Sequence, residues 1–187
     1  MTRGTRPSRH VEPRELVQVA RHYVRELIYG ANDGAITTFA VVAGVAGGGL
    51  PLRAVLIVGA ANMLADGLSM AVGNYLSIRA HESVLEAQGL AEEEAFPARH
   101  GAATFLAFVG AGVVPLVPYM IPGLPVDRFD LSIGLTLLAL FAVGASRALI
   151  GEVRWWLAGG EMAALGAIVA AVAYGSGALV AAVVAGD

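Results

Sequence analysis

Five apolar stretches constrain the fold of this 187-residue chain more than any other feature. A helix that crosses a bilayer needs about 20 mostly apolar residues, and each stretch is long enough. Glycine, proline and polar residues separate the stretches, so the chain can turn where water satisfies its free backbone groups. The pattern predicts an all-α integral membrane protein with five transmembrane helices. These cover residues 28–49, 53–78, 101–122, 130–150 and 160–184.

The composition excludes a soluble enzyme. Hydrophobic residues make up 57% of the chain and charged residues 14%, whereas soluble domains average about 45–50% and about 25%. No nucleotide-binding or catalytic motif is present, and the absence of Cys removes thiolate sites and iron–sulfur clusters. We therefore expect no enzymatic activity and no cofactor. The net charge of −3 gives no indication of a nucleic-acid partner.

The arginines predict the orientation in the membrane. If the N-terminus is cytoplasmic, ten of the twelve Arg residues fall on the cytoplasmic side, and only Arg53 and Arg128 fall on the far side. With five spans, the C-terminus then lies on the far side. The expected parts are a cytoplasmic tail over 1–27 and a transmembrane domain over 28–184, with a short acidic cytoplasmic segment at 79–100.

Asp66 stands in the middle of the second apolar stretch. A charged residue there costs about 2.5–3.5 kcal/mol on insertion scales, and such residues usually face a cavity or a partner. At helical spacing, Asn62, Ser69 and Met70 share one stripe with Asp66. A carboxylate, an amide oxygen and a thioether together suit a softer divalent metal better than Mg²⁺ or Ca²⁺. The alternative is that Asp66 pairs with an Arg or joins two helices.

Asp33 has two interpretations. It can cap a helix that starts at Gly34, because Asp is a favoured capping residue. If the helix instead starts near Ile28, Asp33 lies inside the span, and Thr37 stands one turn further along the same face. The residues alone leave both possibilities open.

Two further acidic regions are weaker candidates for metal binding. Glu82 and Glu86, with the acidic run 92–94, form either a solvated surface or a place where cations collect before transport. Glu161 is expected in the first turn of the last helix, where an acid complements the helix dipole.

The prolines of the third apolar stretch and the histidines give weaker indications of function. Pro115 and Pro118 are expected to kink the third helix and to free carbonyls for a partner. The four histidines have no spacing typical of a metal site; they are His10, His22, His81 and His100.

Four segments resemble the vacuolar iron transporter (VIT) family. The family's first two helices are similar to the segments GANDGAITTFAVVAGVAG and NMLADGLSMAVGNYLSIRA. Its third and fifth helices are similar to ATFLAFVGAGVVPLVPYM and EMAALGAIVAAVAYGSG. The resemblance implies a homodimer of five-helix protomers with the pathway between them. It also implies transport of Fe²⁺, and often Mn²⁺, out of the cytoplasm in exchange for protons.

The resemblance also suggests particular residues. Asp33 aligns with an aspartate of the family's first helix, and Met70 with a methionine of its second. Some members have a glutamate where this chain has Asn62, and Asp66 adds an acid one turn later. Plant-type members carry a long metal-binding insertion between these helices, which the short segment 79–100 lacks, so its ligands are not transferred.

Two alternatives to iron transport remain. The chain could be a non-transporting scaffold or sensor, whose acids only pair with polar neighbours, or it could transport another cation. The expected location is the cell membrane for a prokaryotic chain and a vacuolar or other internal membrane for a eukaryotic one.

Overall fold

The structure is a computed structural model that describes residues 7–10, 13, 15–149, 151 and 153–186. Within these residues every regular element is a helix, and one isolated bridge joins Ser8 to Glu92. The α-helices are α1 (Leu16–His22), α2 (Val24–Gly47), α3 (Leu52–Ala87), α4 (Pro97–Gly112), α5 (Val117–Met120), α6 (Arg128–Ser146) and α7 (Trp155–Ala185). Two 3₁₀ turns, η1 (Val114–Leu116) and η2 (Arg147–Leu149), follow α4 and α6.

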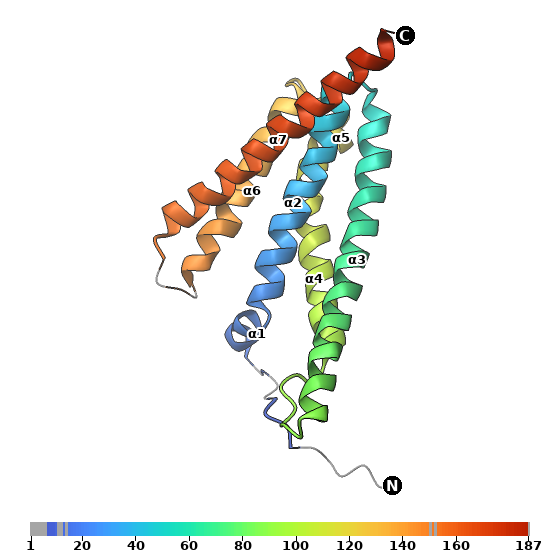
Figure 1. The fold of residues 1–187 in the computed structure, drawn as a ribbon. Coiled ribbons are helices and arrows are strands. Elements are labelled where there is room, and N and C mark those ends of the chain that lie inside the picture. Colours follow the sequence, from blue (N-terminus) through green and yellow to red (C-terminus); the bar gives the residue numbers. More distant parts are fainter. Residues whose placement is uncertain (1–6, 11–12, 14, 150, 152, 187) are drawn as a thin grey trace.

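Helix α2 occupies the centre of the bundle. Helices α3 and α4 lie on one side of it and α6 and α7 on the other, as Figure 1 shows. Glycine allows the closest approach: a Cβ at Gly30 would stand 2.6 Å from the carbonyl oxygen of Thr104, and a Cβ at Gly34 would overlap the backbone of Phe108. Small residues at a spacing of four thus bring α2 against α4, as they do in many membrane helix pairs.

Four of the described helical segments are long and apolar enough to cross a membrane. They are α3, the segment Pro97–Met120, α6 and α7. Helix α2, which contains the predicted first span, does not meet this criterion. Its polar residues, among them Asn32 and Asp33, lower its hydropathy, and its central position shields much of it from the surroundings. A helix covered by other helices needs less apolar surface than one that faces lipid.

The helix boundaries differ from the predicted ones mainly at the polar end of the bundle. Helix α3 continues to Ala87, about 54 Å of helix at 1.5 Å per residue, so it is much longer than a bilayer core of about 30 Å. Helix α7 begins at Trp155 rather than at residue 160. The expected kink at Pro115 and Pro118 is confirmed: α4 gives way to η1 and α5 there. The Ser132 hydroxyl donates a 2.7 Å hydrogen bond to the carbonyl of Pro115.

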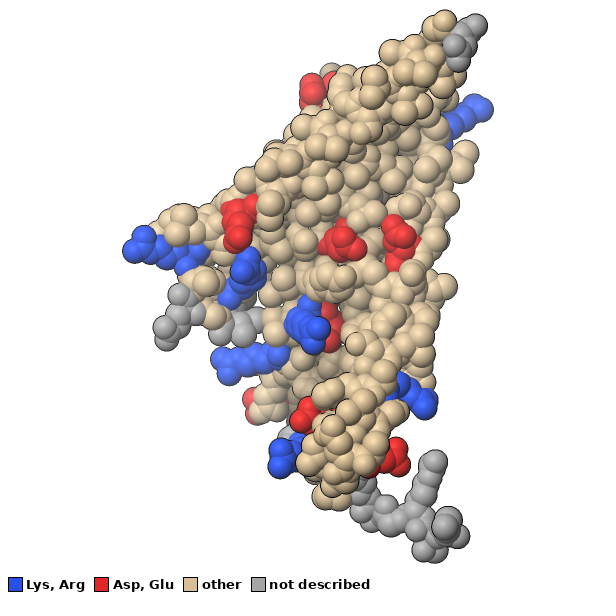
Figure 2. Space-filling view, viewed as in Figure 1, with Lys and Arg blue, Asp and Glu red and all other residues tan. Residues whose placement is uncertain are grey.

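The outer surface is largely apolar. On helices α3 and α7, large apolar side chains are at least 60% exposed, among them Ile57, Leu68, Ile168 and Val184. Figure 2 shows that the upper part of the visible face, where α7 ends, carries few Arg, Asp and Glu side chains, and that most of them lie from the middle of the bundle down to the end where α1 lies. This distribution suits a chain surrounded by lipid along the bundle and by water at its end.

Candidate functional site

Asp33 lies inside α2. The helix begins at Val24, so the alternative in which Asp33 caps a helix starting at Gly34 is wrong. The hydroxyl of Thr37 donates a 3.3 Å hydrogen bond to Oδ1 of Asp33, which confirms that the two residues share one face. Asp33 is partly buried, and α2, which carries it, packs against α3, which carries Asp66.

Asn62 and Asp66 form a hydrogen-bonded pair on α3. The Asn62 amide donates from Nδ2 to Oδ2 of Asp66 across 3.0 Å, as expected for residues one turn apart. Both residues are partly buried. On the same helix, a Cβ added at Gly67 would lie 3.2 Å from the ring of Phe108 and 3.3 Å from that of Phe105, so the glycine lets α3 pack closely on α4. Ser69, which the sequence places on the same stripe of the helix as Asp66, is exposed.

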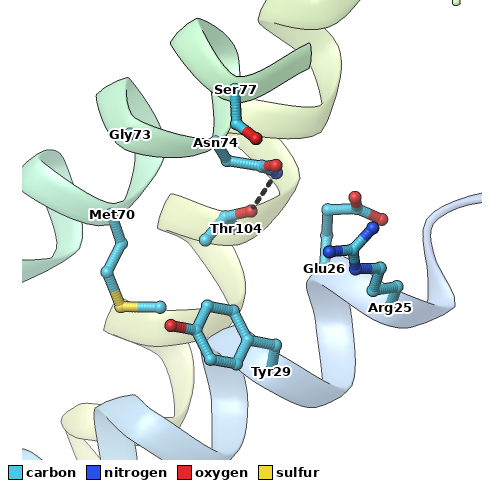
Figure 3. Close-up of a pocket in the computed structure, with 8 residues that line it drawn as sticks. All are labelled: Arg25, Glu26, Tyr29, Met70, Gly73, Asn74, Ser77 and Thr104. Atoms are coloured by element: carbon cyan, nitrogen blue, oxygen red, sulfur yellow. Dashed lines mark hydrogen bonds between the residues drawn. The ribbon is translucent and has the colours of Figure 1, made fainter. Parts of the chain in front are cut away.

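Met70 lies one turn beyond Asp66 and lines a cavity of about 330 Å³. Figure 3 shows its thioether beside the ring of Tyr29, with Asn74 hydrogen-bonded to Thr104 at 3.0 Å. Asp33 and Asp66 are not part of this lining. The cavity walls come from α2, α3 and α4 and consist of Arg25, Glu26, Tyr29, Met70, Gly73, Asn74, Ser77 and Thr104.

A second cavity of about 600 Å³ adjoins the first at the α1 end. The two share four wall residues, and the second is strongly charged. It is lined by His22, Arg25, Glu26, Asn74, Ser77, Ile78, His81, Glu82, Glu93, Glu94 and His100. The space therefore continues from the polar end of the molecule to Met70.

Glu82 organises the segment between α3 and α4. Its Oε1 accepts hydrogen bonds from the backbone N–H groups of Glu93 (3.0 Å) and Glu94 (2.8 Å). Glu86 is exposed and, with Glu82, lines a third cavity of about 290 Å³. Glu82 thus fixes the backbone of the segment between α3 and α4, and the collection of cations by Glu82 and Glu86 stays a prediction.

Glu161 differs from its predicted position. It lies in the second turn of α7, because that helix begins at Trp155, so dipole capping in the first turn is wrong. Its Oε2 instead pairs with Arg147 at 3.2 Å, and both side chains are well exposed. The structure keeps Glu161 apart from the cavities around Met70.

A cluster of histidines and glutamates at the α1 end was missed by sequence reasoning. His10, His22 and His100 surround the carboxylate of Glu94, and His100 also contacts Glu26. Burial and the charges of Glu94 and Glu26 raise the pKa of Tyr23, which lies beside this cluster. The three histidines come from positions far apart along the chain, so no local motif could reveal the cluster.

The long apolar helices and the largely apolar outer surface define a multi-pass, all-helical membrane protein. The sequence profile described as the VIT family matches residues 24–96 and 84–178. The chain therefore belongs to the VIT family.

Individual relatives agree with this assignment. Vacuolar iron transporter homolog 5 of Oryza sativa subsp. japonica is 34% identical over 151 residues, which cover 74% of this chain and 71% of that protein. Vacuolar iron transporter 1 of the same organism is 26% identical over 226 residues, covering 90% and 87%. A vacuolar iron transporter of Toxoplasma gondii is 44% identical over 71 residues, which cover 38% of this chain but only 24% of that protein.

Proposed function

We propose that this protein moves Fe²⁺, and also Mn²⁺, out of the cytoplasm in exchange for protons. The observation that carries the proposal is the placement of two partly buried carboxylates, Asp33 on α2 and Asp66 on α3, on helices that pack together; each accepts a hydrogen bond from a residue one turn away on its own helix. Acids at such positions usually serve an ion pathway. Membership in a family whose named relatives are vacuolar iron transporters supports the same substrate.

The available ligand atoms favour a divalent transition metal. Asp33 and Asp66 offer carboxylate oxygens, and Asn62 lies one turn away with an amide oxygen. Met70 adds a thioether at the cavity that leads to the polar end. Hard ions such as Mg²⁺ prefer oxygen ligands alone, whereas a thioether suits a softer metal.

Proton exchange follows from the chemistry of carboxylates. A carboxylate must lose its proton before it binds a metal, so metal and proton compete for the same oxygen atoms. Two carboxylates on packed helices could share one positive ion or proton, which would relieve the repulsion between two like charges. Release of metal on one side and uptake of protons there would couple the two fluxes.

A homodimer would complete the pathway. Asn62 and Asp66 are only partly buried within a single chain, and their neighbours Leu64 and Leu68 are exposed. A polar pair at this depth is costly beside lipid, whereas a second copy would cover it and supply a matching set of ligands. In this arrangement α2 is the fifth spanning helix; its 24 residues measure about 36 Å, which exceeds a bilayer core of about 30 Å.

The N-terminus and the cavities at the α1 end would face the cytoplasm, in agreement with the excess of arginine there. Metal would then enter from this end. A cell membrane in a prokaryote would make the protein an exporter, and a vacuolar membrane would make it a storage transporter.

Flux through liposomes tests the proposal. The purified chain is reconstituted, and Fe²⁺ or Mn²⁺ uptake is measured with and without a pH gradient. We expect uptake that depends on the gradient and is lost in the D33N/M70A double variant. Normal uptake by that variant would refute the site. Stronger competition by Ca²⁺ than by Mn²⁺ would favour a transporter of another cation, and no flux of any ion would favour a scaffold or sensor.

A further inference from the structure

Three imidazole rings converge on one carboxylate at the α1 end of the molecule. His10 Nδ1 lies 3.1 Å from Oε1 of Glu94, His22 Nε2 lies 3.5 Å from Oε2, and His100 Nε2 lies 2.9 Å from Oε2. The rings also contact one another: His22 lies 5.7 Å from His10 and 5.1 Å from His100 between centroids. The pathway residues Asp33, Asp66 and Met70 play no part in this cluster.

We propose that His10, His22 and Glu94 form a binding site for a divalent transition metal. One ligand atom from each of the three lies within 4.8 Å of the other two. Metal bonds of about 2.0–2.2 Å place the ligand atoms of a tetrahedral site about 3.3–3.5 Å apart. His10 Nδ1 lies 3.1 Å from Oε1 of Glu94 and His22 Nε2 lies 3.5 Å from Oε2, so each nitrogen is close to this spacing from one of the two carboxylate oxygens. Small side-chain shifts would therefore close the site around an ion.

The hydrogen-bonding geometry supplies an independent reason. Nε2 of His22 and both ring nitrogens of His100 are buried, yet they make no hydrogen bond of acceptable geometry to any described residue, although carboxylate oxygens lie 2.9–3.5 Å away. The His100 side chain is only 8% exposed. Buried nitrogens in this condition carry a desolvation cost. An ion coordinated by His22 and Glu94 would give Nε2 of His22 a partner and so remove the desolvation cost there. It would also hold the Glu94 carboxylate in place beside His100.

His100 and Glu26 act as positioning residues for this site. Nε2 of His100 faces Glu94, while Nδ1 of the same ring lies 3.1 Å from Oε1 of Glu26. The ring of His100 therefore lies between the ligand carboxylate of Glu94 and the carboxylate of Glu26. Such outer partners orient metal ligands, and their loss typically weakens metal binding about 10–100-fold.

The backbone brings the three ligands together from separate segments. His10 follows Ser8, whose segment bridges to Glu92: the amide of Arg9 donates to the Glu92 carbonyl at 2.7 Å. His22 is the last residue of α1. Glu94 has its own amide bound to the Glu82 side chain at 2.8 Å. The ligands are therefore held by backbone contacts and not only by one another.

Two histidines and one carboxylate select the class of metal. This ligand set with open positions is typical of Fe²⁺, and imidazole also suits Zn²⁺, Co²⁺ and Ni²⁺. Mg²⁺ and Ca²⁺ favour sites made of oxygen alone. His22 and Glu94 line the 600 Å³ cavity that adjoins Met70, so a metal bound here stands at the start of the proposed route. A role in loading that route rests on the proposed function, whereas metal binding itself does not.

Cobalt binding tests the site. The full chain is purified in detergent with its affinity tag removed, and Co²⁺ alone is added while its visible absorption is recorded. All variants are made on a D33N/M70A background, so that metal in the pathway does not contribute. We expect one Co²⁺ per chain on this background. H10A, H22A or E94Q should weaken its affinity by at least about tenfold.

H81A is the matched control, because His81 also contacts a glutamate, Glu93 at 3.3 Å, but lies outside the three-ligand set. It should bind Co²⁺ as the background does. His10 precedes all the helices, so H10A should keep the elution volume and helical circular dichroism of its parent.

Three results would overturn the site. The first is a Co²⁺ affinity of H10A and H22A equal to that of the D33N/M70A background. The others are loss of Co²⁺ binding in that background itself and no Co²⁺ binding by the parent chain. The proposed function is refuted by a different result, normal metal uptake by the D33N/M70A variant in liposomes. Failure of the metal site and failure of the proposed function can therefore be told apart.

Discussion

Nδ2 of Asn62 donates a hydrogen bond to Oδ2 of Asp66 across 3.0 Å, one turn along α3. The contact holds the carboxylate in a fixed orientation within the apolar part of the bundle. It also offers the charged form of Asp66 one of the hydrogen bonds that it would otherwise take from water. Asp66 can therefore remain available to a cation without a paired arginine.

The first prediction concerns the charge of Asp66. D66N keeps the size of the side chain but removes the negative charge, so metal and proton lose a shared ligand. We expect metal flux into liposomes to fall about tenfold or more, which corresponds to about 1.4 kcal/mol. D130N is the control, because Asp130 lies exposed in the first turn of α6. Unchanged flux in D66N would remove Asp66 from the pathway.

The second prediction concerns the packing of α2 on α4. In G34A the added methyl group overlaps the backbone of Phe108, so the helices must separate. Such overpacking costs about 1–3 kcal/mol, and we expect a lower melting temperature in detergent. G134A on α6 is the control, since nothing lies within 4 Å of a Cβ there. Equal melting of G34A and G134A would contradict the close approach.

The third prediction concerns the break between α4 and α5. S132A removes the buried hydroxyl that binds the Pro115 carbonyl at 2.7 Å and leaves that carbonyl without its partner. We expect a loss of about 1–3 kcal/mol in the free energy of unfolding, measured by chemical denaturation. S176A removes a hydroxyl with the same bond length to its own helix, but at an exposed position, and should have little effect. A loss in S176A as large as that in S132A would show that burial does not matter here.

The fourth prediction concerns Glu161, which lies outside the proposed pathway. Its ion pair with Arg147 is exposed on both sides, and such pairs contribute about 0–1 kcal/mol. We expect E161Q to transport metal like the parent chain and to melt within a few degrees of it. A large loss of flux in this variant would restore Glu161 as a metal ligand.

The sequence predicted those parts of the candidate site that lie within one helix. The face shared by Asn62 and Asp66, and that shared by Asp33 and Thr37, follow from a spacing of four residues. The start of α2 at Val24 was not predictable in the same way. Its first turn is polar, and Glu26 is buried against His100 from a different helix. That contact depends on how α2 packs against α4.

The sequence by itself determined that the chain is helical and apolar, because helix periodicity and hydropathy are local properties, and its similarity to the VIT family lies in continuous segments. Only the tertiary structure decided that α2 occupies the centre and that His10, His22 and His100 meet at Glu94. The physical reason is that these arrangements arise from contacts between distant segments. Close glycine packing and backbone pairing of the N-terminal segment with Glu92 produce those contacts, and neither has a periodic signal along the chain.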